Sequence, residues 1–167
     1  MKPKIQQHIC PVCLMQVDTP DIEARHLDVD YWYCSEQCKA RFIANPGLYV
    51  GRPGEKAPKQ EGKQVLKKRK IYLDEPVSSE TKTGLLLKLF KMMGVRRVQQ
   101  FSNSLVVEYD LLEVTAKQIA EELLASGLQL EESVLQQIRL SLIDIAEESE
   151  IASLEVPQVE KNTSGCH

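Results

Sequence analysis

The sequence predicts an α+β protein made of a small metal-held module and a larger domain in which helices alternate with strands. Three observations predict this. Four of the five cysteines lie in the first 38 residues, in two closely spaced pairs. A stretch rich in Gly, Pro and charge follows, and beyond it apolar residues recur at strand and helix spacing. We expect a module at 1–50, a basic linker at 51–66, a second domain at 67–149 and a disordered tail at 150–167.

Composition places the chain among ordinary globular proteins, with 43% hydrophobic and 27% charged residues in 167. The net charge is −3, but the charge is unevenly distributed. Residues 51–70 hold eight basic and two acidic residues, whereas residues 71–167 hold eight and sixteen. No apolar run approaches the ~20 residues of a membrane helix, and the N-terminus lacks the apolar core of a signal peptide. We therefore expect a cytoplasmic protein without membrane insertion.

The two cysteine pairs are the strongest chemical signal. Cys10 and Cys13 form C-x2-C, and Cys34 and Cys38 form C-x3-C. Two disulfides would need an oxidising compartment, and a redox C-x-x-C normally has no second pair after it. Four free buried thiols would leave the paired spacing unexplained. The pattern therefore predicts a tetrahedral thiolate site for zinc or the softer Cu(I). Spacing alone does not separate a structural zinc from an exchangeable metal.

The elements of the module follow from turn and cap residues. We expect a short strand from Gln16 and an aromatic strand at 31–33 leading into Cys34. Ser35 caps the next helix, which Asn45-Pro46-Gly47 ends. About fifty residues with few large apolar side chains bury little core, so we expect the metal to be needed for folding.

Two residues outside the cysteine pairs, His8 and Cys166, could add a soft ligand to this site. His8 precedes Cys10 by two residues and could replace or supplement a thiolate. Cys166 stands beside His167 at the end of the chain, where an incidental thiol is the simpler interpretation. We expect His26 on a solvated loop.

The module resembles the YHS domain and the related TRASH-type treble-clef zinc modules over roughly residues 8–50. The matching motifs are Cys10-Pro11-Val12-Cys13, Tyr31-Trp32-Tyr33-Cys34-Ser35-Glu36-Gln37-Cys38, Phe42 and Asn45-Pro46-x-x-Tyr49. Cys10 stands where many members have another residue, which favours a four-cysteine site, and Asp30 stands where the family often has Gly. The resemblance implies zinc or copper binding, in company with heavy-metal transporters or metal-responsive regulators.

The basic stretch has two interpretations. Gly, Pro and charge over 51–66 indicate an extended, exposed linker. The tetrapeptide Lys67-Lys68-Arg69-Lys70 could bind nucleic acid or anionic lipid, or it could be a solvated strand edge protected by lysines. The aromatic residues that single-strand binders interleave with cations are missing here, which favours the second interpretation.

The second domain is expected to run strand, helix, strand, strand, helix, strand, which is the ferredoxin-like order. The strands begin at Ile71, Val95, Leu105 and Leu128. Ser78 or Ser79 and then Thr115 cap the two helices, and Gly94 and Gly127 end them. A further helix at 132–148 would pack on the sheet or on a partner. Its surrounding acids form a solvated face or contact the basic linker of another copy.

This domain resembles the heavy-metal-associated domain of copper chaperones and metal ATPases. The matching stretches are Gly94-Val95-Arg96-Arg97-Val98, Leu105-Val106-Val107-Glu108-Tyr109-Asp110, Val114-Thr115-Ala116-Lys117-Gln118-Ile119 and Gly127-Leu128. That family holds metal on a C-x-x-C after the first strand, and the corresponding loop, 74–80, has no cysteine. The resemblance therefore implies the fold and a docking or dimerising platform. Asp74, Glu75 and Glu80 fit a helix dipole better than a hard-cation site.

We find no nucleophile–base pair, Gly-rich phosphate loop or paired acids in a recognisable pocket, so we expect a protein that is not an enzyme. The first hypothesis is a metal-handling or metal-sensing accessory that binds zinc or Cu(I), with a heavy-metal transporter as partner. The second is a metal-responsive nucleic-acid binder that uses Lys67 to Lys70. The third is an adaptor in which zinc is purely structural.

Overall fold

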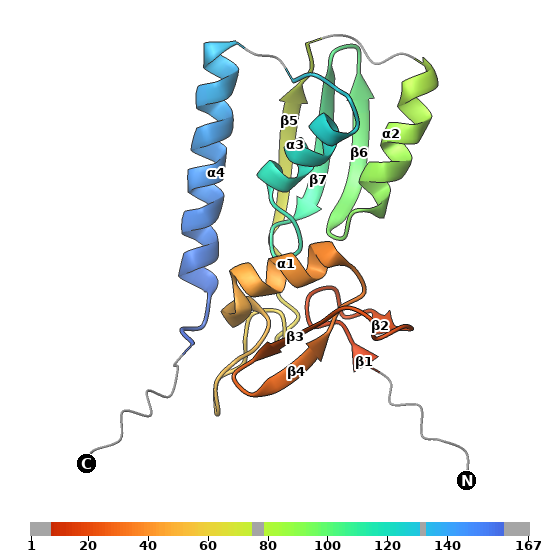
Figure 1. The fold of residues 1–167 in the computed structure, drawn as a ribbon. Coiled ribbons are helices and arrows are strands. Elements are labelled where there is room, and N and C mark those ends of the chain that lie inside the picture. Colours follow the sequence, from red (N-terminus) through yellow and green to blue (C-terminus); the bar gives the residue numbers. More distant parts are fainter. Residues whose placement is uncertain (1–7, 75–78, 131–132, 159–167) are drawn as a thin grey trace, which may run out of the picture. The chain divides into compact units, whose positions relative to one another are not determined.

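A computed structural model of the chain describes residues 8–74, 79–130 and 133–158 (Figure 1). It confirms an α+β protein with four α-helices and small antiparallel sheets. The chain forms two compact units, divided between Gly62 and Lys63 and again between Leu154 and Glu155. We call the first the cysteine unit and the second, residues 63–154, the sheet unit. Among the helices described, none has the length and apolar character that a membrane crossing requires.

The cysteine unit consists of two short hairpins and a helix. Its elements are β1 (His8–Ile9), β2 (Gln16–Val17), β3 (Glu23–His26), β4 (Val29–Trp32), α1 (Glu36–Ala44) and the 3-10 helix η1 (Pro46–Leu48). β1 pairs with β2 and β3 pairs with β4, both antiparallel. The β3–β4 turn places Leu27 and Asp28 at φ of 48° and 64°, as a type I′ turn requires. β3 was not predicted, because Leu27-Asp28 lacks the Asn-Gly signature of that turn.

Aromatic packing forms the core of this unit. Phe42 is 1% exposed, and the rings of four other residues lie with centroids 5.0 to 5.9 Å from its own: His26, Tyr31, Tyr33 and Tyr49. The expectation that His26 sits on a solvated loop is therefore wrong. It lies on β3 against Phe42, and its Nε2 is 3.1 Å from Oε1 of Gln158.

The predicted linker at 51–66 is wrong for most of its length. Residues up to Gly62 belong to the cysteine unit, and Ala57 is fully buried. The Lys59 N–H donates to the Leu48 carbonyl at 3.0 Å. Oε1 of Gln60 accepts from two backbone N–H groups, at Gly51 and Ala57. The Gln60 side chain thus satisfies two backbone N–H groups of this segment. Composition alone cannot predict these hydrogen bonds.

The chain returns to the cysteine unit after its last helix. The carboxylate of Glu155 accepts from the Gly47 N–H at 3.0 Å and from Nδ2 of Asn45 at 3.2 Å. The Val156 N–H donates to the Gly47 carbonyl at 3.1 Å, and Val156 is 7% exposed. We call residues 155–158 the C-terminal return. The predicted disordered tail is thus wrong from 150 to 158, and its remainder lies outside the described residues.

The sheet unit begins with the elements in the predicted order. They are β5 (Leu66–Tyr72), α2 (Ser79–Lys91), β6 (Val95–Phe101), β7 (Ser104–Asp110), α3 (Ala116–Ala125) and α4 (Val134–Leu154). The strands form one antiparallel sheet in the order β5-β7-β6. A capping box between Thr115 and Gln118 starts α3. The predicted fourth strand is reduced to a single bridge between Leu130 and Leu73, beside a bond from the Asp74 N–H to the Gln129 carbonyl.

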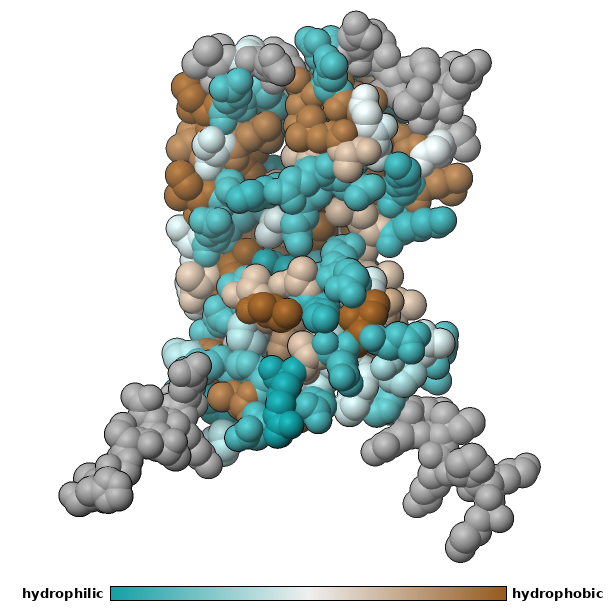
Figure 2. Space-filling view, in the orientation of Figure 1, coloured by the Kyte–Doolittle hydropathy of each residue, from teal (hydrophilic) through white to brown (hydrophobic). Residues whose placement is uncertain are grey.

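Helix α4 joins the sheet through a buried carboxylate. Glu147 is 1% exposed and accepts hydrogen bonds from the Tyr109 hydroxyl and from the Ala116 N–H at 2.9 Å. It also forms an ion pair with Arg69, whose Nε lies 3.5 Å away. Lys67 pairs with Glu150 at 2.6 Å. The acidic residues of this region are therefore more than a solvated face. Figure 2 shows hydrophobic surface along α4, where three large apolar side chains are 52–61% exposed: Ile138, Leu142 and Ile145.

Replacing Gly47 should destabilise the cysteine unit. A Cβ on Gly47 would lie 2.1 Å from the Val156 carbonyl oxygen, so Gly47→Ala must displace the C-terminal return. We expect a loss of roughly 2 kcal/mol in the free energy of unfolding. Trp32, the single tryptophan, lies in this unit, so its fluorescence in a denaturant titration reports it directly. The control is Gly84→Ala in α2, where nothing lies within 4 Å of the added Cβ.

Removing the buried carboxylate should destabilise the sheet unit. Glu147→Ala leaves the Tyr109 hydroxyl and the Ala116 N–H without their acceptor, and we expect a cost of about 3 kcal/mol. Thermal unfolding followed by far-UV circular dichroism measures it. Glu148→Ala, at an exposed neighbouring position, should leave the midpoint within about 1 °C. Equal effects of the two substitutions would contradict this role for Glu147.

Candidate metal centre

The first cysteine pair sits on the turn between β1 and β2. The Leu14 N–H donates to the Cys10 carbonyl and the Cys10 N–H donates to the Met15 carbonyl, both at 2.9 Å. Leu14 has a left-handed φ of 63°, which reverses the chain directly after Cys13. A tight turn of this kind directs both side chains to one side of the hairpin.

The second pair sits where β4 leads into α1. Ser35 is the N-cap of α1, and its hydroxyl accepts from the Cys38 N–H at 3.3 Å. Cys34 immediately precedes the cap, and Cys38 lies in the first helical turn. Both sulfurs are therefore near the positive end of the helix dipole, which favours the thiolate form that binds metal. The predicted cap at Ser35 is confirmed.

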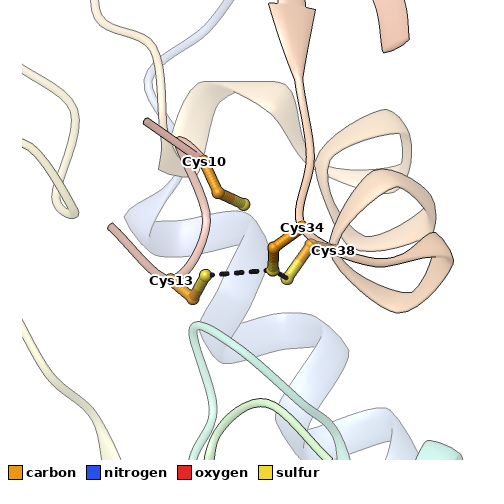
Figure 3. Close-up of side chains that lie close together, drawn as sticks. All are labelled: Cys10, Cys13, Cys34 and Cys38. Atoms are coloured by element: carbon orange, nitrogen blue, oxygen red, sulfur yellow. Dashed lines mark hydrogen bonds between the residues drawn. The ribbon is translucent and has the colours of Figure 1, made fainter. Parts of the chain in front are cut away.

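The four sulfurs converge from these two elements (Figure 3). Every pair of Sγ atoms lies within 4.8 Å, and Cys13 to Cys34 and Cys34 to Cys38 measure 3.4 and 3.6 Å. In a tetrahedral zinc site with Zn–S bonds of ~2.3 Å, the sulfurs are about 3.8 Å apart. All four cysteines are free thiols. The set therefore fits one tetrahedral soft metal ion with small adjustments.

Hydrogen bonds inside the cluster already favour a thiolate. The side chains of Cys13 and Cys38, with backbone N–H groups of Cys13 and Cys34, hold the pKa of Cys10 far below its usual range. The same hydrogen bonds raise the pKa values of Cys13 and Cys38, because each donates its proton to the Cys10 sulfur. A lowered pKa at Cys10 thus accompanies raised pKa values at Cys13 and Cys38, and a bound cation would replace the protons of those two thiols.

The site has a closed side and an accessible side. Cys10 and Cys38 are fully buried, whereas Cys13 and Cys34 are half-buried. Leu14 and Met15, which follow Cys13, are 54% and 52% exposed. An incoming soft ligand would therefore meet Cys13 or Cys34 first.

The structure places the other predicted ligands away from this cluster or leaves them undescribed. His8 lies on β1 with its ring centroid 3.9 Å from that of Trp32, and within the described residues the four cysteines alone make up the ligand group. Cys166 lies outside the described residues. Asp74 is exposed. Glu75 and the side chain of Glu80 lie outside the described part of the structure, so an acidic site there stays a prediction.

The basic tetrapeptide does not form one patch. It lies within β5, where alternate side chains point to opposite faces of the sheet. Lys67 and Arg69 pair with Glu150 and Glu147 of α4, and Lys68 pairs with Glu108 at 2.9 Å. Lys70 lies 4.8 Å from the ring centroid of Tyr72. Three of the four predicted nucleic-acid contacts are thus engaged by carboxylates of the same unit.

All four clustered cysteines were predicted from the sequence, but the residues that support them were not. Glu155 and Gln158 hold the segment after α1, and Gln158 donates to the Val50 carbonyl at 3.0 Å. They lie more than 100 residues from the cysteines, and nothing in their own sequence context signals that contact. Comparison with protein-family models, curated proteins and solved structures finds no match.

Metal affinity should rise with pH. Cys13 and Cys38 have raised pKa values, so they are protonated at neutral pH, and a metal ion must displace both protons. We expect the apparent zinc affinity to increase by at least about two log units per pH unit between pH 6 and 8. Competition with a chromophoric chelator measures it, after correction for the chelator's own protonation. An affinity independent of pH would mean that binding displaces no thiol proton.

Proposed function

We propose that this chain is a heavy-metal-binding protein that holds zinc or Cu(I) on Cys10, Cys13, Cys34 and Cys38. One observation carries the proposal: four sulfurs from two separate elements lie within 4.8 Å of one another. An all-thiolate set suits zinc or Cu(I) and is a poor match for calcium or magnesium, which take oxygen ligands. Zinc is the first choice, because its closed structural sites are tetrahedral.

The likeness of residues 8–50 to YHS and TRASH-type treble clefs supports the same metal chemistry. The sheet unit supports a role beyond metal storage. Its likeness to heavy-metal-associated domains covers residues 94–98, 105–110, 114–119 and 127–128 but not the C-x-x-C of that family. We infer a metal-handling or metal-sensing accessory, not an enzyme. In it the cysteine unit carries the metal and the sheet unit docks a partner such as a heavy-metal transporter. A reducing compartment such as the cytoplasm keeps such thiolates available.

Half-burial of Cys13 and Cys34 favours an exchangeable metal over an inert one. Exchange between thiolate sites proceeds by attack of an incoming ligand, which needs access to the ion. A purely structural zinc has no need of that access. The nucleic-acid alternative is weaker, since Lys67, Lys68 and Arg69 are ion-paired within the sheet unit.

Metal content and exchange test this function. Protein purified without added metal should contain about one zinc per chain by elemental analysis. Titration with Cu(I) buffered by a chelator should release that zinc, while far-UV circular dichroism shows the sheet unit still folded. Cys34→Ser should remove most of the bound metal, whereas Ser153→Ala, at an exposed site on α4, should leave it unchanged.

The outcomes separate the alternatives. Zinc that buffered Cu(I) does not displace would identify a structural site and overturn the handling role. Absence of any stoichiometric metal in both the purified and the zinc-reconstituted protein would overturn metal binding itself. Salt-dependent binding to DNA at low ionic strength would restore the regulator hypothesis.

A further inference from the structure

The strand β5 has one unpaired edge. In the described part of the chain, β5 pairs only with β7 and ends the sheet. The Leu73 N–H donates to the Asn103 carbonyl and the Leu111 N–H donates to the Val65 carbonyl, so the odd-numbered residues of β5 face β7. The N–H and C=O groups of the even-numbered residues therefore point outward: Leu66, Lys68, Lys70 and Tyr72. This row is a template for another strand.

A short stretch of chain already uses the same edge. The Asp74 N–H, the next outward group along the chain, donates to the Gln129 carbonyl at 3.0 Å, and Leu130 bridges to Leu73 antiparallel. Another segment can therefore approach this edge, at least near Leu73 and Asp74. α4 begins at Val134, and β5 has no other described neighbour on this side.

An open groove of about 450 Å³ runs between this edge and α4. Its lining combines three basic side chains of β5 with one basic and four apolar side chains of α4: Lys68, Arg69, Lys70, Ile138, Arg139, Leu142, Ile143 and Ala146. Ile138 and Leu142 are 52% and 61% exposed. The groove thus has an apolar wall beside a row of outward backbone groups.

The charge at the groove is positive. Lys70 and Arg139 both lie over the Tyr72 ring, at 4.8 and 5.4 Å from its centroid. Lys68 is 62% exposed even though it pairs with Glu108, and Arg69 is held by buried Glu147 on the opposite face. Pairing β5 with β5 of a second copy would set lysines of the two strands against each other, which is unfavourable. The charge therefore selects an acidic strand.

We propose that this groove binds an extended segment of a partner protein in which acidic and apolar residues alternate, and that the segment adds a strand to β5. Its apolar side chains would point toward Ile138 and Leu142 of α4. Its acidic side chains would point to the other face, where Lys68 and Lys70 project. Backbone hydrogen bonds to β5 give affinity, and the alternation gives specificity. This site is separate from the metal centre.

The probe is a fluorescein-labelled peptide that alternates glutamate with valine or isoleucine, and the readout is fluorescence anisotropy with the full chain. A peptide with lysine in place of glutamate should bind at least about tenfold more weakly. Lys70→Glu and Leu142→Ser should each weaken the acidic peptide about tenfold, since one reverses the charge and the other removes apolar contact. Lys91→Glu, on the exposed surface of α2, is the matched control and should leave binding within twofold.

Two N-methylated peptides distinguish strand addition from simple charge attraction. One is methylated on its glutamates and the other on its apolar residues, so each loses the N–H groups of one strand edge. Strand addition predicts that one peptide loses binding and the other keeps it. Equal binding of both would overturn the proposal, as would binding of an oligothymidylate with no binding of the acidic peptide. Cys34→Ser should bind like the native chain, so this test and the metal test can fail independently.

Discussion

Four sulfur atoms lie close together in the cysteine unit, and the local structure around them positions them there. A hairpin turn brings Cys10 and Cys13, and a strand-to-helix junction brings Cys34 and Cys38. With 3.4 Å between Cys13 and Cys34, the hairpin and the helix are held at a separation that suits a shared ion. A cation at this point would cross-link the two elements more strongly than the aromatic packing around Phe42 can, because metal–thiolate bonds close the chain at four positions.

The cysteine unit is discontinuous in sequence, and this links it covalently to the sheet unit at two points. The chain leaves after Gly62, forms the sheet unit, and re-enters at Glu155. Glu155 then accepts hydrogen bonds at the start of η1, where backbone N–H groups have no helical partner. The segment after α1 is therefore fixed by residues from the far end of the chain. A domain boundary drawn on composition alone misses this, because a single acidic residue closes the connection.

The uneven charge along the chain is largely resolved inside the sheet unit. The basic strand β5 and the acidic helix α4 are far apart in the sequence but meet in the fold. Lys67 forms an ion pair with Glu150, and Arg69 forms one with Glu147. Alternation along β5 sends Lys68 and Lys70 to the other face. One run of four cations is thus divided between two faces: Lys67 and Arg69 pair with α4, whereas Lys68 pairs with Glu108 and Lys70 lies over the Tyr72 ring.

The sequence by itself determined the thiolate set, the caps at Ser35 and Thr115, and the order of elements from β5 to α3. These depend on residue type and local spacing, which short-range chemistry sets. It could not determine β3, whose turn lacks the usual residues. Nor could it determine that the Gln60 side chain satisfies two nearby backbone N–H groups, or that Glu155 accepts from the Gly47 N–H, 108 residues away. The length of the last strand was also decided in three dimensions, because the pairing described there is limited to one bridge, between Leu130 and Leu73. Long-range hydrogen bonds and ion pairs carry no periodic signal, so only the tertiary structure assigned their partners.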